Sequence, residues 1–164
     1  CAVLLTLLKE ELPLDCTFVF TAQEEVGNRG AFGAGFSATP EIALVLDGAD
    51  TADAPGVPAH KRGCTLGKGV VLPVMDKGSI ADRGLFEELR SLAERETILW
   101  QTSGSIPGRT DAAALQRTKA GVRTAMLSVP VRYHHTPSGL VSLGDVDGML
   151  ALTRAFLSDL AEKE

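Results

Sequence analysis

The sequence contains the uninterrupted apolar run IALVL at residues 42–46, and Asp47 follows it directly. A strand with one solvated face alternates apolar and polar side chains, so five apolar residues in a row predict a strand buried on both faces. Such strands are typical of parallel sheets that carry helices on each side. Residues 42–46 therefore favour an α/β fold.

Strand and helix patterns alternate on both sides of this run. We expect further strands at residues 16–21, 69–75, 97–100 and 122–129, and helices at residues 2–11, 28–37, 82–95, 110–119 and 145–163. This alternation predicts a three-layer sandwich around a mixed, mostly parallel sheet. Residues 48–68 are rich in Gly, Pro and Asp, and a loop of that length in a compact domain is usually functional.

The composition fits one globular domain over residues 1–164, with 45% hydrophobic and 23% charged residues. The net charge of −5 gives no reason to expect nucleic acid as a partner. No apolar run approaches the roughly 20 residues that span a bilayer, so we expect no membrane partner. Three widely spaced cysteines, Cys1, Cys16 and Cys64, argue against a disulfide framework and favour a cytoplasmic location.

The chain begins with Cys1 and enters a helical pattern at once, with no capping residue before it. A helix start normally satisfies its first amides. We therefore expect residue 1 to be an internal point of a longer protein, and the sheet to be incomplete at its N-terminus.

Polar residues follow three of the predicted strands. Glu24 and Glu25 come after residues 16–21 and lead into a glycine-rich turn, and Asp47 ends the strand at residues 42–46. Sites in α/β sheets form beyond the carboxyl ends of the strands. One carboxylate of a Glu pair can bind a metal while its neighbour accepts a proton from water. The alternatives are a solvated surface pair for the glutamates and a turn-forming role for Asp47.

The strand at residues 122–129 is followed by His134 and His135, close to Pro137. Imidazole is a common zinc ligand, although a lone histidine is more often structural. Together with the carboxylates, these side chains suit zinc, cobalt or manganese. We find no Gly-x-Ser-x-Gly elbow, phosphate loop or dinucleotide fingerprint that would indicate other chemistry.

Four ordered motifs resemble a known family. They are FVFTAQEEVG at residues 18–27, the segment from Leu46-Asp47 through DAPG at 53–56 to LGKG at 66–69, TDA at 110–112, and PVRYHHTP at 130–137. The chain is similar to the glutamyl and deblocking aminopeptidases with a co-catalytic metal pair, which include the tetrahedral aminopeptidases and proteins labelled endoglucanases.

The resemblance implies a role for individual residues. It implies Glu24 as the general base, Glu25 and His135 as ligands of one metal, and Asp47 as a ligand of the other. His135, rather than His134, matches the Arg-Tyr-x-His pattern of the family.

The TDA motif implies that Thr110 and Asp111 lie on the substrate side. Arg109 stands where the family usually has a second glycine, so the resemblance does not fix the local loop geometry of this chain.

The resemblance also implies two divalent metal ions in the complete protein, zinc or cobalt, with manganese possible. The bridging Asp, an upstream His and the insert domain of the family have no counterpart here. We therefore expect the C-terminal part of a catalytic domain with half of a metal site, inactive in isolation. The complete protein is expected to cleave N-terminal residues from peptides, as a cytoplasmic homo-oligomer.

Two alternatives remain open from the sequence. In the first alternative, the chain is a metal-poor, catalytically silent fragment, pseudoenzyme or assembly domain. In the second it belongs to a related two-metal amidohydrolase that acts on blocked or C-terminal residues.

Overall fold

The sheet is built around one long parallel pair of strands. A computed structural model of the chain describes residues 1–103 and 108–163. Strand β1 (Ile42–Asp50) runs parallel to β4 (Arg123–Arg132), in a register that runs from Ile42 opposite Arg123 to Asp50 opposite Val131. Residues 124–130 of β4 are all buried, as expected for a strand that is covered on both faces.

Three short strands complete the sheet. β2 (Val70–Val71) pairs antiparallel with β4 and parallel with β3 (Trp100–Gln101), while β5 (Leu140–Val141) pairs antiparallel with the end of β4. The strand order is β1-β4-β2-β3, with β5 beside β4. The predicted α/β class with a mixed, mostly parallel sheet is confirmed.

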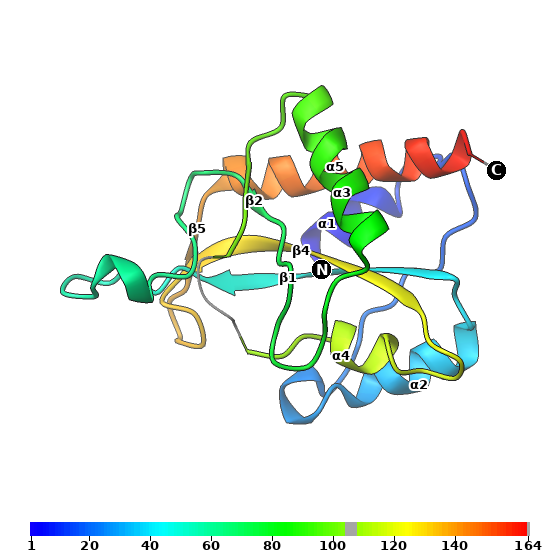
Figure 1. Cartoon of the computed structure of the whole chain (residues 1–164), viewed down its shortest axis with the longest axis horizontal. Coiled ribbons are helices and arrows are strands. Elements are labelled where there is room, and N and C mark those ends of the chain that lie inside the picture. Colours follow the sequence, from blue (N-terminus) through cyan, green and yellow to red (C-terminus); the bar gives the residue numbers. More distant parts are fainter. Residues whose placement is uncertain (104–107, 164) are drawn as a thin grey trace.

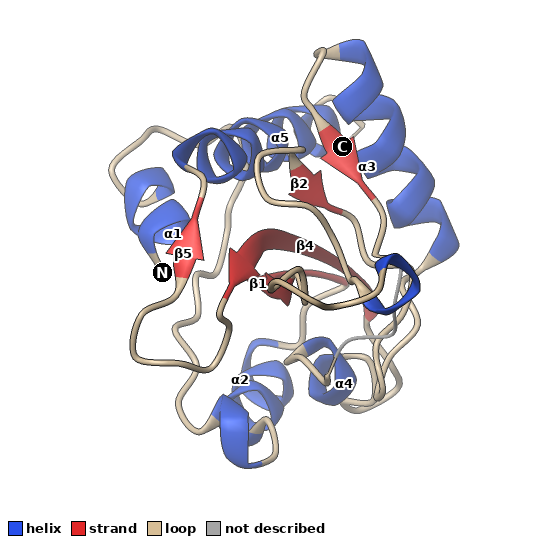
Figure 2. Cartoon of the chain, turned by 90° about the vertical axis from the view of Figure 1, so that its left-hand side faces the viewer, coloured by secondary structure: helices blue, strands red, loops and turns tan. Residues whose placement is uncertain are grey.

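Helices cover both faces of this sheet (Figures 1 and 2). On one face lie α1 (Ala2–Leu7), α3 (Arg83–Arg95) and α5 (Leu143–Ala161), and on the other lie α2 (Arg29–Ala38) and α4 (Ala112–Leu115). The larger core forms under α3 and α5, where the largest fully buried side chains include Leu72, Leu85, Leu89, Leu127, Leu152 and Phe156.

Helix α3 illustrates how the sequence specifies these elements. The side chain of Asp82 accepts a hydrogen bond from the amide of Leu85 at 3.0 Å, which caps the helix start. Leu85, Leu89 and Leu92 then recur at helical spacing and are buried against the sheet. The helix ends before Thr97, whose φ of +57° cannot continue it.

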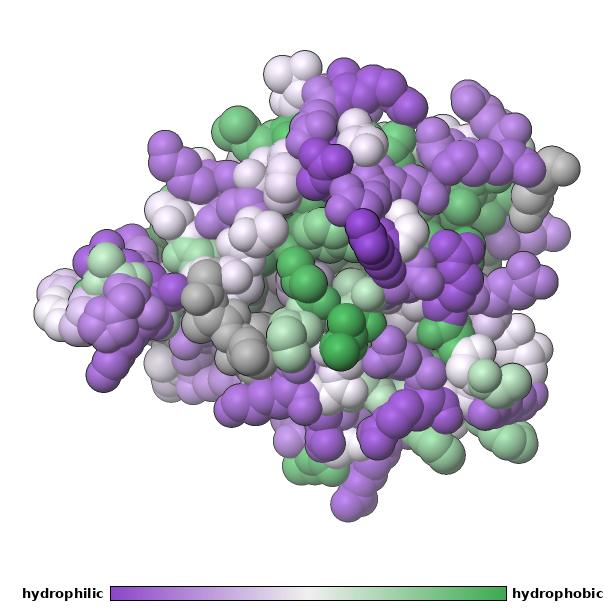
Figure 3. Space-filling view, in the orientation of Figure 1, coloured by the Kyte–Doolittle hydropathy of each residue, from purple (hydrophilic) through white to green (hydrophobic). Residues whose placement is uncertain are grey.

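The outer surface is mostly polar. On the face shown in Figure 3, hydrophobic side chains gather over the segment between β2 and α3, where Val74 and Ile80 are 50% and 61% exposed. No helix in residues 1–103 or 108–163 is long and apolar enough to cross a membrane.

The predicted strand at residues 16–21 is wrong. These residues are irregular, and in the described chain no backbone hydrogen bond pairs them with another segment. A strand needs a neighbour to accept and donate those bonds, however suitable its composition. Phe18 nevertheless packs against the main core, whereas Phe20 is 45% exposed.

Other predicted bounds shift. The strands expected at 69–75 and 97–100 shorten to β2 and β3, and the helices expected at 2–11 and 110–119 shorten to α1 and α4. Strand β1 instead continues to Asp50, so Asp47 lies inside the strand and does not end it.

Candidate active site

The two glutamates lie in a tight turn between the irregular segment and α2. They begin the short 3-10 helix η1 (Glu24–Val26), which is flanked by Gln23 at a φ of +59° and Gly27 at +113°. Two left-handed residues on either side of one turn fix the direction in which the carboxylates project, and glycine adopts this conformation without strain.

Asn28 holds Glu24 in place. Its side-chain amide donates to Oε1 of Glu24 at 2.9 Å and to Oδ1 of Asp111 at 3.3 Å, and the residue is almost fully buried. Burial raises the pKa of Glu24, and the negative charges of Asp47, Glu25 and Asp111 raise it further, against the opposing effect of Asn28. A carboxylate with a raised pKa holds a proton more readily, which suits a general base.

Asp47 projects from β1 into the same group of charges. Its Oδ1 accepts a hydrogen bond from the amide of Gly48 at 2.7 Å. Burial raises the pKa of Asp47, as does the charge of Asp111, while the Gly48 amide and the charge of His134 lower it. Asp47 is therefore a half-buried carboxylate held by a rigid strand, close to Asp111 and His134.

The two histidine rings lie near different carboxylates. Nδ1 of His135 lies 3.4 Å from Oε1 of Glu25, and the backbone of His135 is left-handed, with a φ of +57°. His134 instead faces β1, because a Cβ built on Gly48 would lie 3.3 Å from its Nε2. The rings of His134 and His135 are 4.0 Å apart between centroids.

The sequence indicates both histidines as candidates and the family resemblance favours His135, so the proximity of His134 to Asp47 emerges only from the structure. In an extended chain, adjacent side chains point to opposite sides. An extended continuation of β4 would therefore separate the rings of His134 and His135. The left-handed turn at Tyr133 and His135 keeps both rings on the site side.

Asp111 and Thr110 are both buried and belong to different networks. Asp111 accepts hydrogen bonds from Oγ1 of Thr21 at 2.5 Å and from Asn28. The amide and hydroxyl of Thr110 both donate to Oδ2 of Asp76 at 2.9 Å. Thr110 therefore faces a buried carboxylate, and only Asp111 lies among the site residues.

Asp76 was also missed in the sequence. Its Oδ1 accepts from the amides of Gly78 and Ser79 at 2.7 and 2.6 Å, and these bonds with those from Thr110 lower its pKa although burial alone would raise it. The run DKGS at residues 76–79 has the form of an Asx turn, which is the signal that could have revealed it.

The donors fit one part of a metal site. Carboxylate and imidazole are ligands that zinc and related ions prefer. Within residues 1–103 and 108–163, however, no group of three or more His, Cys, Asp or Glu side chains converges closely enough to hold an ion. A catalytic zinc site typically has three protein ligands, so these residues do not complete one by themselves.

Comparison with known proteins gives a consistent result. A model of the family described as M42 glutamyl aminopeptidase matches residues 1–152. The lysyl aminopeptidase of Pyrococcus furiosus is 37% identical over 147 residues, which are 89% of this chain and 41% of the relative. The chain spans 41–47% of the length of the curated relatives it matches.

Solved structures share the fold. An aminopeptidase from the archaeon Desulfurococcus kamchatkensis superposes with a TM-score of 0.89 at 34% identity, covering 94% of this chain and 45% of the other. The TET1 peptidase of Pyrococcus horikoshii, which can assemble into a tetrahedron or a large octahedral shell, superposes with a TM-score of 0.66 at 31% identity, covering 84% and 39%.

Proposed function

The chain belongs to the M42 glutamyl aminopeptidase family, and from this premise we propose that it is the C-terminal part of the catalytic domain of a metal-dependent aminopeptidase. The complete protein removes N-terminal amino acids from peptides. Residues 1–164 contribute the general base and part of the metal-ligand set. The remaining ligands belong to the part of the protein that this chain does not contain.

The observation that carries this proposal is the environment of Glu24. Asn28 fixes one carboxylate oxygen, and burial together with three neighbouring carboxylates favours the protonated form. Glu24 takes a proton from the attacking water and returns it to the leaving amine. A group that must accept and then release a proton works best when its pKa lies near the operating pH.

The charge of the site supports a substrate with a free amino terminus. Glu24, Asp47 and Asp111 have no Lys or Arg within 4.0 Å in the described residues, and the ion pair that Glu25 forms there is with His135. Of these carboxylates, Glu24 and Asp111 are not assigned to a metal ion, and their negative charges would attract a peptide α-ammonium group. This supports an aminopeptidase over an amidohydrolase that acts on blocked residues.

Two divalent ions, zinc or cobalt with manganese as an alternative, complete the proposal. Glu25 and His135 would contribute to one, and Asp47 to the other. A divalent ion bound there would supply the positive charge that polarises the scissile carbonyl. Glu25, Asp47 and His135 would orient the ions, while Glu24 stays free to handle the proton.

We further propose that the complete protein is a homo-oligomer that works in the cytoplasm. The TET1 peptidase of Pyrococcus horikoshii can assemble into a tetrahedron or a large octahedral shell. Cys1, Cys16 and Cys64 are all free, which fits a reducing compartment.

The decisive experiment compares Glu24→Gln with wild type in the complete protein, using aminoacyl-anilides and added zinc or cobalt. We expect kcat to fall about 10²–10⁴-fold, with KM little changed, because only proton transfer is lost. Glu41→Gln is the matched control, since Glu41 is exposed and lies outside the site. Equal activity of Glu24→Gln and wild type would remove the role given to Glu24.

A silent, metal-poor domain is the second candidate, and the absence of any three-ligand group among the described residues favours it. Calorimetric titration of the chain with zinc separates the two. Tight binding of two ions by the chain alone would reject the silent domain.

A further inference from the structure

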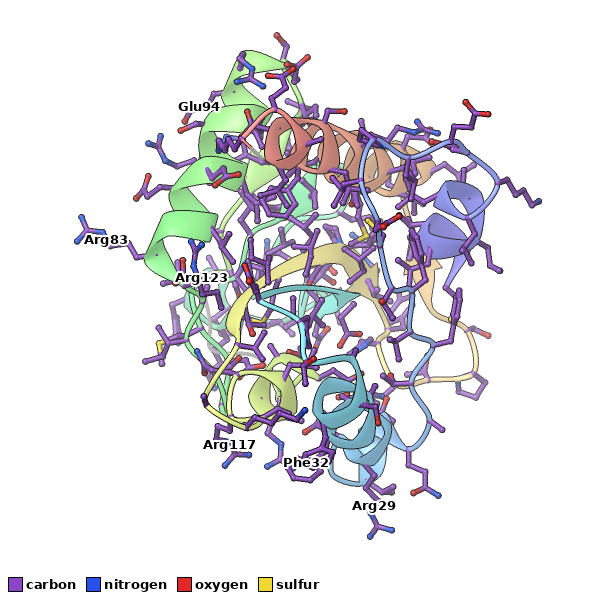
Figure 4. The ribbon with its side chains drawn as sticks, turned by 90° about the vertical axis from the view of Figure 1, so that its right-hand side faces the viewer. Arg29, Phe32, Arg83, Glu94, Arg117 and Arg123 are labelled. Carbon is purple, nitrogen blue, oxygen red and sulfur yellow. The ribbon has the colours of Figure 1, made fainter. Side chains whose placement is uncertain are left out.

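A basic pocket opens beside the candidate active site. It has a volume of about 470 Å³ and lies between the start of α2 and helix α4. Its lining includes Gly27, Asn28, Phe32 and three arginines, Arg29, Arg109 and Arg117. Figure 4 shows Phe32 on α2 and Arg117 just beyond the end of α4, with Arg29 extending outward from the first turn of α2.

The three arginines differ from most of the others in the chain. Arg90, Arg95, Arg123, Arg132 and Arg154 each form an ion pair with a carboxylate. Within residues 1–103 and 108–163, no carboxylate lies within 4.0 Å of Arg29, Arg109 or Arg117. Three unpaired cations around one pocket, in a chain of net charge −5, repel one another and attract an anion.

Two of these side chains are held by their surroundings. Nε of Arg117 donates to the carbonyl of Ala113 at 2.8 Å, which leaves the end of the guanidinium available. The stem of Arg109 packs over Gly78, where an added Cβ would lie 2.5 Å from its Cδ. A guanidinium that is already positioned loses less entropy when it binds, so the pocket is partly preorganised.

The start of α2 adds to the positive potential. Arg29 is the first residue of this 10-residue helix, and the first turn contains no acidic residue. A cation at the positive end of a helix is unfavourable unless an anion offsets it. The position of Arg29 is therefore costly for the folded chain and useful for an anionic ligand.

The pocket shares a residue with the candidate site. Asn28 lines the pocket, and its side chain bonds to both Glu24 and Asp111. Resting on the proposed function, we propose that this pocket binds a carboxylate of the peptide substrate. Arginine binds carboxylate through two parallel hydrogen bonds, and the 58% exposed ring of Phe32 offers an apolar wall for the adjoining carbon chain.

Arg109 makes this feature specific to the chain. The resemblance to the aminopeptidase family places a glycine at that position, and glycine would leave the pocket with two arginines. The carboxylate has two possible sources, an acidic side chain or the free C-terminus of a short peptide.

The test measures direct binding to the 164-residue chain, in chelator, by two-dimensional NMR titration. N-acetylglycine carries only a terminal carboxylate, N-acetylglutamate α-amide carries only a side-chain carboxylate, and N-acetylglycinamide carries neither. We expect at least one carboxylate probe to bind, with shifts centred on Gly27–Phe32 and on α4, and the neutral amide not to bind. The probe that binds more tightly identifies the source of the carboxylate.

The variant Arg109→Gln/Arg117→Gln is expected to weaken that binding at least tenfold. Arg83→Gln is the matched control, because Arg83 projects from α3 on the other side of the sheet (Figure 4) and should leave binding unchanged. Melting temperatures verify that all variants fold. The proposal is overturned if the neutral amide binds as tightly as the carboxylate probes. It is also overturned if the double variant binds the carboxylate probes as tightly as wild type does.

Inorganic phosphate is titrated as a further probe. Phosphate binding without carboxylate binding also overturns the proposal. No turnover enters these measurements, so their failure leaves the aminopeptidase proposal intact. Conversely, equal activity in the Glu24→Gln comparison leaves the carboxylate binding standing.

Discussion

At the scale of single residues, Asn28 links the candidate base to the rest of the molecule. It is buried, has a left-handed backbone with a φ of +56°, and donates to carboxylates from two different elements. Asn adopts the left-handed region more readily than most residues, and its amide supplies two donors. One residue thus meets a backbone requirement and a hydrogen-bonding requirement together.

These two requirements predict different costs for two substitutions. Asn28→Gly removes the amide but keeps the left-handed backbone accessible, and we expect it to lower the free energy of unfolding by about 1–3 kcal/mol. Asn28→Ala adds the strain of a left-handed alanine, roughly 1–2 kcal/mol more. Urea unfolding of the metal-free chain measures both. A glycine variant as unstable as the alanine variant would show that the left-handed backbone costs nothing here.

At the scale of elements, Gly69 determines whether β2 and β3 can pair. Its φ is +94°, and a Cβ added there would lie 2.0 Å from the carbonyl oxygen of Leu99. The same carbonyl accepts the amide of Val70 at 3.0 Å, so strand pairing begins at this contact. Asp145, from the start of α5, fixes the turn by accepting the amides of Gly67 and Gly69.

Gly67 provides the matched comparison for Gly69. It also has a positive φ, +75°, but an added Cβ would meet nothing within 4 Å. We expect Gly67→Ala to cost roughly 1–2 kcal/mol from backbone strain alone. Gly69→Ala should cost more than about 3 kcal/mol, because the Leu99 backbone must also move. Thermal unfolding distinguishes them, and equal losses would refute the close contact.

A helix or strand can be predicted from the sequence when the residues that determine it lie within the element itself. Strand β1 and helix α3 carry their determinants locally, as an apolar run and as a cap with an amphipathic face, and both were predicted. Residues 16–21 have strand composition, but pairing depends on a partner elsewhere in the chain, which local composition cannot reveal. Strands β2 and β3 shorten for the same reason.

The candidate site likewise contains residues with a local sequence signal and residues that depend on contacts between elements. Glu24, Glu25 and Asp47 could be selected as candidates because a polar residue after an apolar run is a local signal, although residues 16–21 form no strand and β1 continues past Asp47. Asn28 and His134 act through contacts between elements, and the distances that define them exist only once α4, β1 and β4 have packed.

At the scale of the whole molecule, one segment lies outside the layers. Residues 51–63, with the 3-10 helix η2 (Ala59–Lys61), extend away from the end of the sheet (Figure 1). The base of this arm is fixed to the sheet by Thr51, whose amide donates to the carbonyl of Val131 at 3.0 Å. Two hydrogen bonds from Arg132 to Asp53 then join the arm to β4.

Asp53 predicts how the stability of this attachment depends on pH. The hydrogen bond from Arg132, followed by that from Thr51, holds the pKa of Asp53 well below its usual range. A carboxyl group whose pKa is lower in the folded state stabilises it above the unfolded pKa of about 3.9. That contribution is lost as pH falls through the folded-state pKa, since the folded state then gains the same proton.

The corresponding variant is Asp53→Asn. At pH 7 we expect it to lower the free energy of unfolding by about 1–2 kcal/mol, a modest value because Arg132 is partly exposed. The difference from wild type should shrink progressively as the pH is lowered from about 5 toward 2. Asp15→Asn, at an exposed position, should give no comparable difference at either pH. Urea unfolding at constant ionic strength measures the stability of wild type and of both variants. If Asp53→Asn lowers the free energy of unfolding equally at pH 7 and pH 2, the charge of Asp53 does not hold the arm against β4.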